Sequence, residues 1–247
     1  MSDTSWDPET YQTVADFVAK LGEPLIKLLA PKPTDIILDV GCGDGSLSAK
    51  VLPLCRTLVG VDSSPQMIEA AIERGINGYV KDAQHLDFNE HFDSVLSNAA
   101  LHWMKSPEAV LSGIFKALKP GGVFVAEFGG LGNADKIVVA LEHALNKRDI
   151  AFNNPWYFPS AEEYSTLLTQ QGFIIEHIKL FERFTPLPQH LSHWILTFAQ
   201  SFLRQTSATQ SKEIINEVVN EIRDDLYADQ QWHVDYVRLR LKAIRPS

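Results

Sequence analysis

The amino-acid sequence predicts an α/β fold, a doubly wound and mostly parallel sheet, and two observations carry this prediction. Short apolar runs without a polar alternate face recur through the first half of the chain, as expected for strands that are buried on both sides. Helix-like segments separate these runs, which is typical of parallel strands joined by right-handed crossovers. The chain has 247 residues, enough for one large domain with a complete hydrophobic core.

The predicted elements of the first half alternate regularly. The predicted strands are residues 36–40, 58–62, 78–82, 92–97 and 123–128, and the predicted helices are residues 46–54, 65–73 and 107–118. Pro65 and Pro107 stand in the first turns of two helices, where a proline loses no helical hydrogen bond. The sequence Lys-Pro-Gly-Gly at residues 119–122 is expected to end the third helix.

The second half departs from this alternation. Residues 134–147 and 160–171 are predicted helices, and residues 173–184 and 232–244 are predicted strands. Between these strands, residues 185–231 carry apolar side chains at helical spacing, so we expect a helical cap inserted within the C-terminal half. Residues 7–30 also look helical, with interruptions near Gly22 and Pro24. No linker marks off a second independent domain, so residues 1–247 are predicted to form one domain.

Composition and charge exclude several classes of protein. Hydrophobic residues make up 45% and charged residues 21% of the chain, which excludes disordered, collagen-like and coiled-coil proteins. Lys and Arg number 22 against 31 Asp and Glu, so a net charge of −9 would repel a polyanion and we expect no nucleic-acid partner. Cys42 and Cys55 form neither a disulfide framework nor a metal-ligand pattern, so we predict no metal site.

Neither a targeting segment nor a membrane span is expected. The first ten residues are acidic and polar, and they lack the basic and apolar regions of a signal peptide. No apolar run approaches the ~18–20 residues of a membrane span. We therefore predict a cytoplasmic protein without a membrane partner.

The strongest local feature is the sequence Asp-Val-Gly-Cys-Gly-Asp-Gly-Ser at residues 39–46, between a predicted strand and a predicted helix. Its glycines allow a tight turn and a close approach to a ligand, and the next helix offers free N–H groups. The dinucleotide pattern G-x-G-x-x-G requires a glycine where Ser46 stands, which disfavours a nicotinamide-dependent oxidoreductase. Asp39 would repel a pyrophosphate and attract an ammonium group.

Polar side chains close the next three predicted strands. Asp62 follows the glycines by about 20 residues, where a carboxylate can accept hydrogen bonds from ribose hydroxyls; a helix N-cap is the alternative. Asp82 can accept from an adenine amino group, or it can serve only as a turn residue. Asn98 falls at the carboxyl edge of the sheet, where doubly wound folds bind their ligands.

In this order, the motifs make the sequence resemble the class I S-adenosylmethionine-dependent methyltransferases. The resemblance covers residues 34–128 and includes Leu-Lys-Pro-Gly-Gly at residues 118–122. Residues 97–103 and 158–173 are similar to the small-molecule branch that includes trans-aconitate 2-methyltransferase. The resemblance implies a Rossmann-like sheet of seven strands with an antiparallel last strand, and a cofactor-binding core at residues 30–130.

The resemblance also implies S-adenosylmethionine as the cofactor and distributes its parts over these motifs. Asp39 would lie near its ammonium group, Gly41 and Gly43 against its methionine part, Asp62 on its ribose and Asp82 by its adenine. The full set predicted to bind the cofactor is Asp39, Gly41, Cys42, Gly43, Asp62, Ser63, Met67, Asp82, Ala83 and Asn98.

Methyl transfer is an in-line displacement, so the protein must mainly align the donor and the acceptor and exclude water. We predict a small-molecule acceptor that carries a carboxylate or a hydroxyl group; a carboxylate needs no base. His102 is the candidate catalytic residue, as a base or a hydrogen-bond donor, and a structural histidine is the equal alternative. Tyr11, Trp103 and Trp156 are candidate substrate residues, with ordinary packing as the alternative.

An anionic acceptor would need a local cation, for which Arg183, Arg204, Arg238 and Arg240 are candidates. We expect acceptor selectivity to reside in the predicted cap and the N-terminal helix. A methyltransferase that acts on RNA or protein is the rival hypothesis, although the chain shows no basic track. A non-catalytic S-adenosylmethionine-binding protein is a further alternative. The sequence leaves the identity of the acceptor and the oligomeric state open.

Overall fold

The computed structural model describes residues 21–247, so Tyr11 and most of the predicted N-terminal helix lie outside the described residues. The chain divides into two compact units. The first comprises the described residues up to Leu131, with Tyr157–Leu180 and Arg238–Ser247. The second comprises Gly132–Trp156 and Phe181–Val237, and it therefore contains all of the predicted cap.

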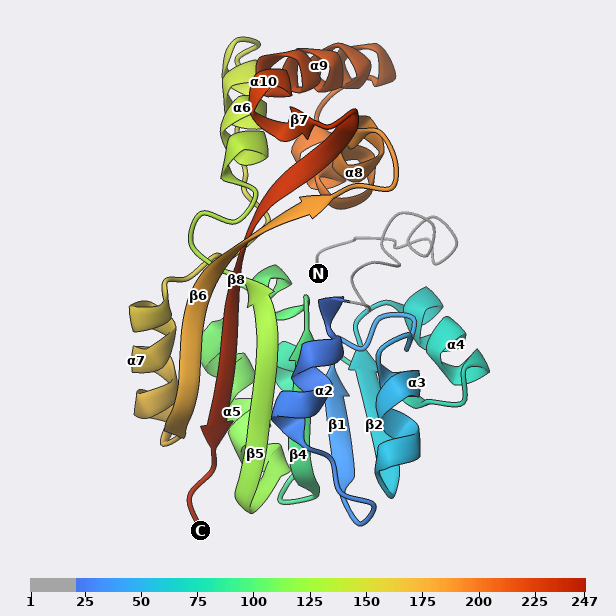
Figure 1. Ribbon diagram of the computed structural model, residues 1–247, viewed down its shortest axis with the longest axis vertical. Coiled ribbons are helices and arrows are strands. Elements are labelled where there is room, and N and C mark those ends of the chain that lie inside the picture. Colours follow the sequence, from blue (N-terminus) through green and yellow to red (C-terminus); the bar gives the residue numbers. More distant parts are fainter. Residues whose placement is uncertain (1–20) are drawn as a thin grey trace. The chain divides into compact units, whose positions relative to one another are not determined.

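The main sheet has the strand order β3-β2-β1-β4-β5-β8-β6 (Figure 1). Its parallel strands are β1 (Ile36–Val40), β2 (Thr57–Asp62), β3 (Asn77–Val80), β4 (Phe92–Asn98) and β5 (Leu118–Gly129). The last strand, β8 (Gln231–Ile244), runs antiparallel to β5 and lies between β5 and β6 (Ile174–Pro186). The predicted α/β class and the antiparallel last strand are thereby confirmed.

The helices of the first unit cover both faces of the sheet. They are α2 (Glu23–Leu29), α3 (Ser48–Val51), α4 (Pro65–Glu73), α5 (Pro107–Ala117) and α7 (Ala161–Gln171), with 3-10 turns η1 (Leu52–Leu54), η2 (Ala83–His85) and η3 (Leu101–Trp103). Alternate residues of β1 enter different cores: Ile37 packs with α2, α3 and α4, whereas Leu38 packs with α5 and α7. This two-sided burial explains the apolar runs of β1, β2 and β4. The predicted burial of the third strand was wrong, because β3 lies at the edge of the sheet and is mostly exposed.

Three predicted boundaries were wrong. The helix predicted at residues 46–54 is divided into α3 and η1, because Pro53 lacks the N–H that a continuous helix would use. The third strand ends at Val80 rather than at Asp82. The fifth strand begins at Leu118, because Gly121 and Gly122 exchange backbone hydrogen bonds with Arg245 near the end of the chain.

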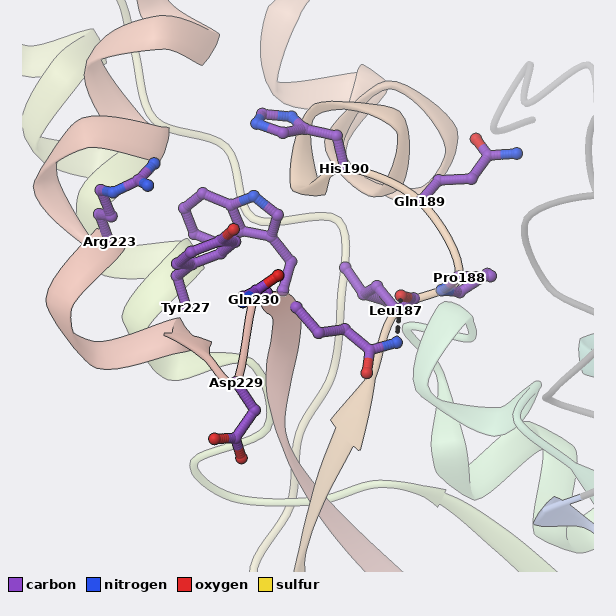
Figure 2. A pocket seen from close by; sticks show the side chains of 10 residues that line it. Leu187, Pro188, Gln189, His190, Arg223, Tyr227, Asp229 and Gln230 are labelled. Carbon is purple, nitrogen blue, oxygen red and sulfur yellow. Dashed lines mark hydrogen bonds between the residues drawn. The ribbon is translucent and has the colours of Figure 1, made fainter.

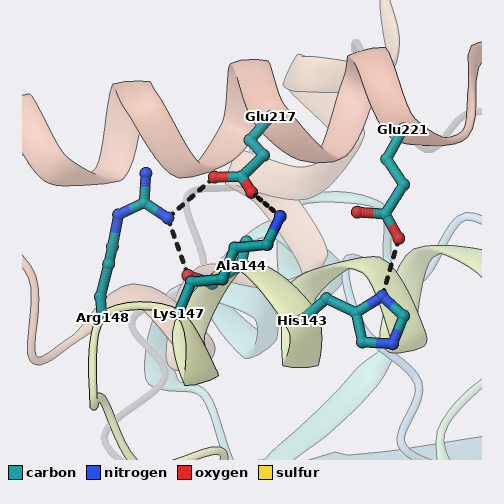
Figure 3. A network of polar contacts seen from close by, with 6 residues as sticks. All are labelled: His143, Ala144, Lys147, Arg148, Glu217 and Glu221. Atoms are coloured by element: carbon teal, nitrogen blue, oxygen red, sulfur yellow. Dashed lines mark hydrogen bonds and ion pairs between the residues drawn. The ribbon is translucent and has the colours of Figure 1, made fainter.

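The second unit contains α6 (Asp135–Asn146), α8 (Leu191–Phe198), η4 (Gln200–Leu203), α9 (Ala208–Glu221), α10 (Arg223–Leu226) and the short strand β7 (Tyr227–Ala228), which pairs with β8. Charged side chains join α6 to α9 (Figure 3). Glu217 binds both Lys147 and Arg148, and His143 contacts Glu221 at 2.8 Å. None of the helices formed by residues 21–247 is long and apolar enough to cross a membrane.

Candidate functional site

The glycine loop after β1 has a left-handed backbone at Gly41, Gly43 and Gly45, with φ of +71°, +55° and +77°. The surroundings of the first two differ. A Cβ on Gly41 would lie 2.2 Å from the Ala100 Cβ, whereas a Cβ on Gly43 would meet no atom within 4 Å. Gly41 is thus required by packing, while Gly43 borders open space that a ligand can enter.

Asp62, at the end of β2, contacts the glycine loop directly. Its Oδ2 accepts a hydrogen bond from the Gly43 N–H at 3.1 Å, and its Oδ1 accepts one from the Ser64 N–H at 2.9 Å. Burial raises the pKa of this carboxyl group, and the backbone hydrogen bonds act against that rise. Ser64, not Asp62, is the N-cap of α4, because its hydroxyl accepts from the Met67 N–H at 3.3 Å.

Asp39, in β1, is a second carboxylate in this region and, unlike the half-buried Asp62, it is buried. It is 2% exposed, and its Oδ2 accepts a hydrogen bond from the Ser48 hydroxyl at 2.5 Å. Burial raises its pKa to about 7, the Ser48 hydrogen bond opposes this, and the negative charge of Asp62 adds to it. Because two acidic groups lie close together away from water, a bound cation would be favoured here.

The other residues predicted around the cofactor differ in exposure. Met67 and Ala83 are buried, whereas Ser63 is exposed. The Cys42 side chain packs in the core, where a Cβ on Gly60 would lie 2.8 Å from its Sγ, and burial raises the pKa of the thiol. Only the backbone of Cys42 therefore belongs to the loop surface.

Asp82 lies beyond β3 and caps the 3-10 turn η2. Its Oδ1 accepts a hydrogen bond from the Gln84 N–H at 2.9 Å, and its side chain is 46% exposed. This geometry matches the turn role that the sequence left as the alternative. The neighbouring Ala83 is the first residue of η2.

Asn98 ends β4, and the described N-terminal segment lies against it. A Cβ on Gly22, the N-cap of α2, would lie 2.8 Å from the Asn98 Nδ2. The next residue, Ala99, has a φ of +55°, and its N–H donates to the Glu127 carbonyl at 2.7 Å. Gly22 therefore lies against the carboxyl end of β4.

His102 is held as a neutral side chain. Its Nδ1 accepts a hydrogen bond from the Gly129 N–H at 3.3 Å, so its proton is on Nε2. Burial lowers its pKa well below 6.5, and the positive charge of Arg238 lowers it further. The His102 ring lies beside the rings of Trp103 and Phe158, with centroids 5.5 Å and 5.7 Å away. This arrangement favours a hydrogen-bond donor over a general base.

The four candidate arginines are divided between the two units. In the first unit, Arg240 binds the buried Glu127 at 2.6 Å, and Arg238, two residues earlier on β8, is 7% exposed and opposite Gly129. Arg183 lies 5.1 Å from the Phe181 ring in the second unit, which also contains Arg204. Only the first pair shares a unit with the predicted cofactor residues.

Trp156, the remaining predicted substrate residue, is part of the second unit. It is 5% exposed and packs edge-on against Phe202, with ring centroids 5.3 Å apart, and lies beside Trp194. Its surroundings match ordinary packing, the alternative that the sequence left open.

Two contacts of the glycine loop were missed in the sequence. Ser48 supports Asp39, and Arg74 binds both the main-chain carbonyl and the carboxylate of Asp44. An acid within the loop was the only local signal, because Arg74 lies 30 residues away along the chain. Within the residues that the structure describes, no group of three or more acidic, His or Cys side chains is arranged to hold a metal ion.

A pocket of about 530 Å³ lies within the second unit (Figure 2). Arg223 lines it with its guanidinium 4.5 Å from the Tyr227 ring, and the ring of His190 lies edge-on to Trp232 at 5.4 Å. None of the predicted cofactor or catalytic residues lines this pocket.

Comparisons with known proteins agree with the geometry of the first unit. The family described as a methyltransferase domain matches residues 38–126. The chain is 38% identical to an uncharacterized methyltransferase, C70.08c, of Schizosaccharomyces pombe, over 98% of this chain and 99% of the relative. It is 26% identical to the trans-aconitate 2-methyltransferase of Rhodococcus jostii, over 69% of this chain and 70% of the relative.

Solved structures share the fold. Phosphoethanolamine N-methyltransferase 2 of Haemonchus contortus, in complex with S-adenosyl-L-methionine, matches with a TM-score of 0.59 and 20% identity, covering 92% of this chain and 53% of that one. The glycine loop, the acid that ends β2 and the full-length relative point to one conclusion. This chain belongs to the class I S-adenosylmethionine-dependent methyltransferases, and S-adenosylmethionine is its cofactor.

Proposed function

We propose that the protein methylates a carboxylate group of a small molecule. The observation that carries this proposal is Arg238, a buried cation on β8. Its positive charge lies close enough to His102 in the first unit to lower the pKa of that residue. An anionic acceptor needs such a cation, because the chain as a whole has a net charge of −9. The relative named trans-aconitate 2-methyltransferase supports the same class of acceptor.

The chemistry of the loop region fits the cofactor. S-adenosylmethionine carries an ammonium and a sulfonium charge, and the buried Asp39 and the half-buried Asp62 provide two carboxylates. Gly43 leaves open space beside them, as a ligand that approaches the backbone requires. In our proposal Asp39 binds the ammonium group and Asp62, with Ser63, binds the ribose.

The adenine in this proposal lies near Met67 and Ala83, whose side chains are apolar and buried. Asp82 contributes less, because its carboxylate already accepts from Gln84. The backbone of Gly41 and Cys42 completes the surface for the methionine part.

When bound, S-adenosylmethionine supplies an electrophilic methyl group in line with its departing sulfur. Arg238 would hold a carboxylate of the acceptor, and the Nε2–H of the neutral His102 would donate a hydrogen bond to it. Gly22 and Asn98 would limit the access of water from the side of α2. An acceptor carboxylate is already a nucleophile at neutral pH, so it needs no base.

The test has a binding part and a transfer part. Calorimetry should show S-adenosylmethionine binding to the wild type, weakened at least tenfold in Asp62→Ala. Transfer of a labelled methyl group should then be measured with small carboxylates and alcohols, with RNA and with protein. Arg238→Gln should raise the KM for a carboxylate acceptor without changing cofactor affinity. Methylation of RNA with salt-sensitive binding, or cofactor binding without transfer to any acceptor, would contradict the proposal.

A further inference from the structure

Arg74 ties the end of α4 to the glycine loop. Its Nε donates to the main-chain carbonyl oxygen of Asp44 at 2.9 Å, and its Nη2 binds the Asp44 carboxylate at 2.9 Å. The Asp44 side chain is 8% exposed and that of Arg74 is 34% exposed. The Arg74 guanidinium therefore covers the Asp44 carboxylate and also donates a hydrogen bond to the backbone of the loop.

The loop side of this contact is equally well defined. The Asp44 Oδ1 accepts from the Ser46 N–H at 3.1 Å, and its Oδ2 accepts from the Ser46 hydroxyl at 2.7 Å. Asp44 stands between Gly43 and Gly45, both with a left-handed backbone. Because glycine has the largest conformational freedom of any residue, such a loop needs an anchor to stay in one conformation.

The loop is held by two residues, and both belong to the β2–α4 segment. Asp62 precedes α4 and accepts from the Gly43 N–H, and Arg74 follows α4 and donates to the Asp44 carbonyl. The peptide units before Gly43 and after Asp44 are thus both held, beside the open space at Gly43.

We infer that Arg74 is a positioning residue for S-adenosylmethionine, which it never touches and on which it acts through Asp44. A loop that is ordered before binding loses less entropy when the ligand arrives, so the affinity is higher. This inference rests on the proposed placement of the cofactor against Gly43.

The experiment compares cofactor affinity with stability. Calorimetric titration with S-adenosylmethionine and with S-adenosylhomocysteine should give dissociation constants about tenfold higher for Arg74→Ala than for the wild type. Arg74→Lys should lie in between, because an ammonium keeps the charge but not the two-point geometry. The double variant Arg74→Ala/Asp44→Ala should bind no more weakly than the weaker single variant, since both residues act through one contact.

Arg148 in the second unit offers a matched control (Figure 3). Its Nη1 also binds a main-chain carbonyl, that of Ala144, and a carboxylate, that of Glu217, each at 2.8 Å. Arg148→Ala should lower the Tm and leave the dissociation constant unchanged. If Arg74→Ala behaves in the same way, Arg74 is only structural and the inference is wrong.

Asp62→Ala separates this failure from failure of the proposed cofactor placement. Weakened binding in Asp62→Ala together with unchanged binding in Arg74→Ala would overturn the inference alone. Unchanged binding in both variants would overturn the placement as well.

Discussion

Two acidic side chains, one from each unit, are held in opposite ways. In the first, Asp39 is buried, its pKa is raised to about 7, and the neutral hydroxyl of Ser48 supports it. In the second, Glu217 lies at the surface between Lys147 and Arg148, whose hydrogen bonds lower its pKa. The charged form of the Asp39 carboxylate is thus poorly stabilised. The charged form of Glu217, in contrast, is already stabilised by two positive side chains.

This difference separates ligand binding from structural support. A buried carboxylate with a raised pKa gains most when a cation arrives, because the cation replaces the lost hydration. An exposed carboxylate between two basic side chains gains little from any further ligand, and its ion pairs contribute little to folding. We therefore expect changes at residues of the first unit that border the cofactor space to alter affinity, and changes at the ion pairs of the second unit to alter stability slightly.

The largest effect is expected for Gly41→Ala. A left-handed φ of +71° and a clash at 2.2 Å with Ala100 should destabilise the fold by about 3 kcal/mol. Thermal unfolding and urea titration measure this loss. A wild-type Tm for this variant would show that the glycine loop adapts and that its packing is not tight.

Gly43→Ala should act on affinity more than on stability. The backbone strain at φ +55° costs about 1 kcal/mol, but the new methyl group meets no protein atom within 4 Å and enters the space assigned to the cofactor. We expect a dissociation constant for S-adenosylmethionine about tenfold higher or more, by calorimetry. Unchanged affinity would contradict the cofactor placement.

Asp39 should make cofactor binding depend on pH. Its pKa of about 7 in the folded state lies above the ordinary value of 3.8, so the folded protein binds more protons than the unfolded chain between these values. Stability of the free protein due to this group therefore falls as pH rises through that window. Because the cofactor's cation favours the ionised carboxylate, affinity should rise about tenfold from pH 6 to pH 8. Titration of Asp39→Asn with the cofactor should give a weak and nearly pH-independent affinity. An unaltered pH profile in this variant would show that another group causes the pH dependence.

The smallest effect is expected for Glu217→Gln. The residue, on α9, forms ion pairs with Lys147 and Arg148, which directly follow α6. Such contacts contribute little, so the Tm should fall by no more than about 2 °C and cofactor affinity should not change. A large loss of cofactor affinity would show that the two units are coupled in binding and would remove the contrast between them.

The central strands β1, β2 and β4 were predictable because they are buried on both faces, and such strands appear in the sequence as apolar runs. The third predicted strand was wrongly expected to be buried in the same way, because β3 lies at the edge of the sheet and is mostly exposed. The ends of the strands were less predictable from the sequence. Lys119 to Gly122 are turn-forming residues by local preference, but Arg245 pairs with the two glycines and draws this stretch into β5. Asp82 was placed at a strand end, yet its own turn chemistry separates it from β3.

The sequence by itself determined the fold class, the glycine loop and the acid at the end of β2, because these depend on local backbone freedom and on hydrophobic periodicity. Only the tertiary structure decided how charges are partnered. Arg74 reaches Asp44 across 30 residues, Arg240 reaches Glu127 across 113, and the Gly129 N–H selects the tautomer of His102. Such contacts arise when elements distant along the chain pack together. No local sequence pattern determines which distant side chain becomes the partner of a given charge.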